Sequence, residues 1–222
     1  MTSTLIVPPI LTPALRDEAV EHLRRYFAPV SGTTGWAGSR FERLAGGGDR
    51  PDTADRFTAD DLVAVSLLSV SVPPHGAIQL LESRADEFAR LLAEIPHDLE
   101  LVDVESIPDD WAPNRLWTAL RDIHGIGWVT AGKLLARKRP RLIPVYDTVV
   151  QAAVEPTASF WEALRAALRA DDRALHRHLL SLRDEVGIGD DISALRVFDV
   201  VVWMHHRYLD PASDADADAD AA

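Results

Sequence analysis

Hydrophobic residues recur at helical intervals along most of the chain, and few segments alternate as strands do. The spacing predicts helices over residues 13–27, 75–95, 111–123, 128–137, 159–170, 174–186 and 192–209. The aliphatic run at residues 62–72 would also suit a strand, but Thr58 and Asp61 before it match a capping box, which favours a helix. Ser159 and Glu162 form a second such pattern, and Asp191 is expected to cap the last helix. The pattern predicts an all-α fold.

Segments rich in proline, glycine or aspartate separate these helices. Pro8, Pro9 and Pro13 favour an extended start, and residues 31–56 form a loop rich in glycine and aspartate with no role evident from the sequence. Residues 96–109 read as a linker, and residues 210–222 as a disordered acidic tail of low complexity. We therefore expect a single domain over residues 1–209.

Composition excludes several classes of protein and site. The 222 residues are 47% hydrophobic and include no cysteine, which rules out disulfides, thiolate metal sites and iron–sulfur clusters. No apolar run approaches the roughly 18–20 residues of a membrane helix. The first residues lack the pattern of a signal peptide, so a cytoplasmic location is expected. No metal site is predicted, because His205 and His206 are adjacent, and His176 and His178 are also too close together, to face one ion from a helix.

The charge is unevenly distributed. A net charge of −12 argues against a nucleic-acid partner, but residues 115–141 carry seven basic residues and one acidic residue. An acidic protein with one basic region would attract a phosphate backbone to that region alone.

The basic region contains the segment Gly125-Ile126-Gly127 between two predicted helices. Glycine lets a phosphate approach the backbone closely, and the unpaired N–H groups at the start of the following helix favour an anion. Thr130 could add a hydroxyl, and Lys133 and Arg137 follow near helical spacing. The alternative is an ordinary helix–turn–helix connection, with the basic residues on a solvated helix end.

The hairpin and a downstream aspartate match a known pattern. Its members here are Leu120, Ile123, Gly125, Ile126, Gly127, Thr130 and Ala131, followed by Asp147-Thr148 after Pro144-Val145. Over residues 120–149 the chain resembles the helix-hairpin-helix DNA glycosylase superfamily. The segments KLLARKRPRLIPVYD and VVWMHHR also resemble a family of uncharacterised bacterial proteins.

The resemblance implies a multi-helix bundle of the glycosylase type, with the hairpin at residues 115–150. Such a protein would contact the sugar-phosphate backbone of duplex DNA. No cofactor is expected. The residues expected to contact DNA are Gly125, Ile126, Gly127, Thr130, Lys133, Arg137, Lys138, Arg139 and Arg141.

The resemblance also assigns the catalytic carboxylate to Asp147, which would assist hydrolysis of an N-glycosidic bond. Tyr146, Trp117 and Trp128 are candidate walls for a flipped base, with Trp203 a weaker one. Val129 stands where bifunctional members have a lysine, so a monofunctional enzyme is expected. Asp147 also suits a helix N-cap, which leaves open a non-catalytic protein that binds DNA or a protein partner.

Overall fold

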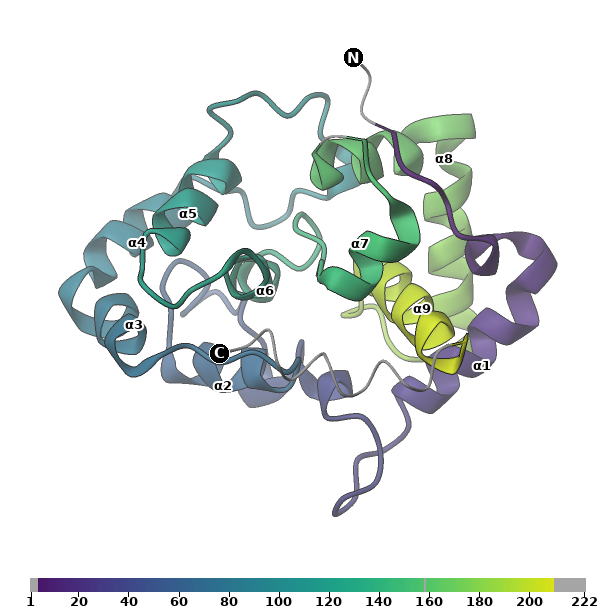
Figure 1. Cartoon of the computed structure of the whole chain (residues 1–222), viewed down its shortest axis with the longest axis horizontal. Coiled ribbons are helices and arrows are strands. Elements are labelled where there is room, and N and C mark those ends of the chain that lie inside the picture. Colours follow the sequence, from purple (N-terminus) through teal and green to yellow (C-terminus); the bar gives the residue numbers. More distant parts are fainter. Residues whose placement is uncertain (1–3, 158, 210–222) are drawn as a thin grey trace.

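The computed structural model describes residues 4–157 and 159–209, and these residues form helices and loops without a β-strand (Figure 1). The all-α prediction is confirmed for this part of the chain. The α-helices are α1 (Arg16–Tyr26), α2 (Ala59–Ser66), α3 (Pro74–Ile78), α4 (Ala85–Ala93), α5 (Ala112–Arg121), α6 (Trp128–Lys138), α7 (Thr148–Val154), α8 (Phe160–Val186) and α9 (Ala194–Leu209). The predicted acidic tail, residues 210–222, lies outside the described residues.

Helix α6 lies near the middle of the molecule, between α2–α5 on one side and α1 and α7–α9 on the other (Figure 1). It packs against α2 and α5, while α9 packs against α1, α7 and α8. Leu134 of α6 and Val197 and Val201 of α9 are fully buried, as expected for central helices. No helix among the described residues has the length and apolar character needed to cross a bilayer.

The capping box predicted at Thr58 forms as expected. The Thr58 backbone N–H donates to Asp61 Oδ2 over 2.9 Å, and α2 begins at the next residue. The second predicted box does not form: α8 begins after Ser159, but Glu162 accepts from the Arg165 guanidinium instead of reaching back to the cap.

Asp191 does not cap the last helix. Its carboxylate accepts from Arg43 over 2.7 Å, and the Ser193 hydroxyl accepts the Arg196 N–H at the start of α9 over 3.1 Å. The helix starts at Ala194, two residues later than predicted, and Ser193 caps it in place of Asp191.

Two predicted helical regions are interrupted. The region 75–95 is divided into α3, a π-helical turn at Gln79–Ser83 and α4, with Arg84 at φ −122° ending the turn. Within α8 the helical geometry is lost at residues 170–173, where Asp171, Asp172 and Arg173 have positive φ. This second break coincides with the boundary predicted between residues 170 and 174.

Candidate functional site

The predicted hairpin is present, with α5 and α6 joined by a tight turn. Ile126 is 3% exposed and its N–H donates to the Ile123 carbonyl over 3.0 Å, so it holds the turn against the core. Gly125 has φ +85°, and a Cβ there would lie 3.0 Å from Cγ of Pro73. The positive φ and the close approach of Pro73 show that the fold itself requires glycine at position 125.

Gly127 is different, because the fold does not require it. It is exposed, precedes α6 as the N-cap residue, and has φ −77° and ψ 177°, which any residue can adopt. A Cβ at this position would meet no atom within 4 Å. The start of α6 is thus open to the close approach of an external group, where the free N–H groups of its first turn favour an anion.

The basic run after the hairpin is buried, which corrects the prediction that its side chains contact DNA. Lys133, Arg137, Lys138 and Arg139 are each 5% exposed or less. They are held inside the protein by carbonyl and carboxylate oxygens, and none presents a free cation to a phosphate.

The loop at residues 31–56 supplies many of these oxygens. Arg137 donates to the carbonyls of Phe41, Glu42 and Leu44, and Lys138 donates to those of Gly48 and Thr53. Arg139 donates to further carbonyls, of Ala54, Leu92 and Ile95, and to the Asp55 carboxylate. The basic run therefore fastens this loop to the end of α6, a role that the sequence did not reveal.

Asp61 of α2 balances two of these buried cations. It is 1% exposed, with Oδ1 3.2 Å from Nε of Arg137 and Oδ2 2.5 Å from Nζ of Lys138. Burial lowers the pKa of Lys138, and the Asp61 carboxylate opposes that shift. These ion pairs join α2 to α6, and the hydrogen bonds of the same two cations join α6 to the loop.

The other side chains predicted to contact DNA differ in their exposure. Thr130 is buried, while Arg141 is partly exposed and donates to the Glu100 carboxylate and to the Asp190 carbonyl. Arg121 and His124 are exposed beside the turn, and the Arg121 guanidinium lies 4.7 Å from the centre of the Trp117 ring. These two residues are exposed basic groups close to the turn between α5 and α6.

Asp147 caps helix α7, which confirms the prediction that it suits a helix N-cap. Its Oδ1 accepts the Val150 N–H over 3.1 Å, and its Oδ2 lies 3.7 Å from Nζ of Lys133. The side chain keeps 17% of its surface exposed. One hydrogen bond and one ion pair thus orient a carboxylate that solvent still reaches.

Lys133 reaches Asp147 from inside the protein. Its ammonium donates to the Leu68 carbonyl over 2.9 Å. Burial lowers the pKa of Lys133, while Asp147 and then Asp199 act to raise it. A buried amine therefore stands directly behind the candidate carboxylate.

A further buried ionic group lies behind this pair. Arg196 binds both Asp199 and Glu42, so one cation faces two carboxylates. Burial raises the pKa of Asp199 to about 7 and also raises the pKa of Glu42, against the opposing effect of Arg196. This arrangement favours retention of a proton by one of the two acids.

The three aromatic residues predicted to line a base pocket are brought together. The ring centres of Trp128 and Tyr146 are 5.4 Å apart, and Tyr146 stacks on Phe160 with centres 3.8 Å apart. The Trp117 indole N–H donates to the Trp128 carbonyl over 3.4 Å. Trp203 belongs to a separate cluster with Trp36, and the cluster near Asp147 consists of Trp117, Trp128, Tyr146 and Phe160.

A surface pocket of about 210 Å³ lies at the other end of α6. Residues of the loop at 31–56, including Arg43 and Asp49, line it together with Arg141 and Asp191. Its lining includes none of the residues that contact Asp147.

Comparison with known proteins identifies the family of this chain. A search of curated proteins and a search of solved structures each found no similar protein. Residues 19–206 match the model of a family described as "Family of unknown function (DUF6308)". The match spans most of the chain, from α1 to α9, and the chain belongs to this family.

Proposed function

We propose that this protein binds duplex DNA through the turn between α5 and α6 and hydrolyses the N-glycosidic bond of a base placed near Asp147. One observation carries the proposal: Trp128 and Tyr146 pack together, with ring centres 5.4 Å apart. Trp128 follows Gly127, and Tyr146 precedes Asp147. The contact therefore joins the open start of α6 to the oriented carboxylate.

DNA binding rests on the backbone of the turn. A phosphate can approach Gly127 because no side chain stands there, and the N–H groups of the first turn of α6 can donate to it. Arg121 and His124 add exposed basic groups at the same place. Contacts of this kind position a protein on DNA without reading its sequence.

The chemistry assigned to Asp147 follows from its setting. Departure of a base leaves positive charge on the sugar, which a carboxylate can stabilise while water attacks. The oxygen of water bonds to the sugar carbon, and the base leaves with a proton, so the products are a free base and an abasic site. The N–H of Val150 and the ammonium of Lys133 hold the carboxylate in a fixed orientation for this step.

A screen for abasic-site formation tests the proposal. Duplexes that each contain one damaged or mismatched base are incubated with protein and then cleaved with alkali at abasic sites. We expect the wild type to cleave at least one substrate and Asp147→Asn to cleave none, although its amide oxygen can still cap α7. Asp122→Asn, which removes an exposed carboxylate from the hairpin, is the matched control and should keep full activity.

A non-catalytic DNA-binding protein is the second candidate. It is favoured by the internal partners that both Asp147 oxygens have, which give the residue a structural role without any chemistry. Binding of the wild type to the duplexes, with every base left in place, would support this candidate and overturn the enzymatic proposal.

A further inference from the structure

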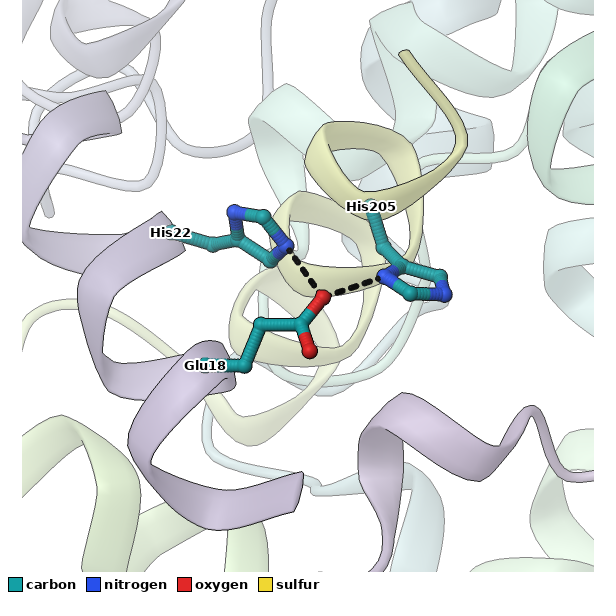
Figure 2. A group of neighbouring side chains, drawn as sticks. All are labelled: Glu18, His22 and His205. Carbon is teal, nitrogen blue, oxygen red and sulfur yellow. Dashed lines mark hydrogen bonds and ion pairs between the residues drawn. The ribbon is translucent and has the colours of Figure 1, made fainter. Parts of the chain in front are cut away.

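Three potential metal ligands from the two ends of the described chain meet at the contact between α1 and α9. Glu18 and His22 lie one turn apart on α1, and His205 lies on α9 (Figure 2). The side chains point toward a common centre at the Glu18 carboxylate. The partner of His205 is thus not its neighbour His206 but a pair of residues more than 180 positions away in the sequence.

The separations of the donor atoms suit a small ion. Oε1 of Glu18 lies 2.9 Å from Nδ1 of His205 and 3.5 Å from Nε2 of His22, and the three donor atoms all lie within 4.8 Å of one another. A tetrahedral zinc ion with bonds of about 2.0–2.1 Å needs ligand atoms roughly 3.3 Å apart. Small side-chain adjustments would therefore place an ion at equal distance from all three.

We propose that Glu18, His22 and His205 bind a zinc ion through Oε1, Nε2 and Nδ1, respectively, with one coordination position left for water. Two imidazoles and one carboxylate are a ligand set that zinc accepts readily. Magnesium and calcium prefer sites built from oxygen alone, so this set selects against them. The site is independent of the proposed action on DNA.

The surroundings fit an ion that enters from solvent and is held against the core. His22 is 6% exposed, while the side chains of Glu18 and His205 keep 46% and 23% of their surface. Arg25, a cation on the next turn of α1, is paired with Glu21 at 2.7 Å. A bound ion would join α1 to α9 and thereby stabilise their packing.

Zinc binding can be measured on the untagged, full-length protein after treatment with a chelator. Calorimetric titration with Zn²⁺ in excess Mg²⁺ should give one ion per chain, and the melting temperature should rise with Zn²⁺. Co²⁺ in place of Zn²⁺ should give the visible absorption of a tetrahedral site. Glu18→Gln changes an exposed side chain and His205→Ala a partly exposed one, so both should fold. Each should weaken binding by about 100-fold or more, since even outer-shell changes cost 10–100-fold.

The control is His97→Ala, which removes a different exposed histidine–carboxylate pair, formed with Asp55 at 2.9 Å. It should bind Zn²⁺ as the wild type does. Absence of saturable binding would overturn the proposal. Binding that persists in both Glu18→Gln and His205→Ala would overturn it as well, because the ion would then lie elsewhere.

Discussion

Lys133 on α6 and Asp147 at the start of α7 form an ion pair, with Nζ 3.7 Å from Oδ2. The pair joins the helix that begins at the hairpin to the helix that the candidate carboxylate caps. Lys133 is 5% exposed and also donates to the Leu68 carbonyl, so its ammonium is fixed. The position of the Asp147 carboxylate therefore depends on a buried amine as well as on the backbone of α7.

Replacing Lys133 with methionine should separate activity from stability. Methionine fills a similar volume, and it removes a charge whose burial already lowers the pKa of Lys133. Asp147 remains partly hydrated without its partner, so we expect the free energy of unfolding to stay within about 1 kcal/mol of the wild type. Base excision should fall while DNA affinity is retained. Urea unfolding measures the stability, and the alkali assay measures base excision. Unchanged excision would contradict the role given to Lys133.

Asp61→Asn should destabilise the protein strongly. The substitution leaves the buried side chains of Arg137 and Lys138 without their carboxylate, which costs about 3–5 kcal/mol in comparable cases. Asp60→Asn, at the exposed neighbouring position, is the matched control and should change stability by less than about 0.5 kcal/mol. Equal urea midpoints for the two variants would show that the basic run is not held by Asp61.

Asp199 should make stability depend on pH. Burial raises its pKa to about 7, whereas an unfolded aspartate titrates near 4. The folded state therefore keeps a proton that the unfolded state loses, and this stabilising contribution, complete below about pH 4, is lost as pH rises through 7. Asp199→Asn cannot ionise, so its stability relative to the wild type should increase between pH 5 and pH 8, by about 1 kcal/mol or more. A constant difference over that range would be evidence against the raised pKa.

Any excision should leave abasic sites intact. Val129 cannot form an imine, and the Lys133 amine is held between the Leu68 carbonyl and Asp147. We expect no strand cleavage without alkali and no product trapped by borohydride. A trapped product that disappears in Lys133→Met would instead identify Lys133 as a nucleophile.

Local patterns predicted much of the fold. The hairpin, the helix from Trp128 and the cap at Thr58 depend on neighbouring residues, and each forms as expected. The prediction that Asp147 caps a helix, made from the extended residues before it, is also confirmed. The catalytic role inferred from its place after the hairpin stays a prediction.

Features that depend on distant contacts were not predictable. A run of Lys and Arg at the end of a helix normally faces water, and its burial here depends on carbonyls of the loop at 31–56, whose path no local pattern specifies. The meeting of His205 with α1 depends on how α1 and α9 pack. The sequence signal for the proposed zinc site was the four-residue spacing of Glu18 and His22, which places both on one face of a helix.

The DNA affinity of Gly127→Val tests the central claim most directly. Gly127 has an ordinary backbone conformation and open space at its Cβ, so the variant should fold as the wild type does, which its melting temperature will verify. The valine side chain should block a phosphate from the start of α6, and affinity should fall about tenfold or more, equally for duplexes of unrelated sequence. A folded variant that binds DNA as tightly as the wild type would contradict the account, because the hairpin would then be only a turn.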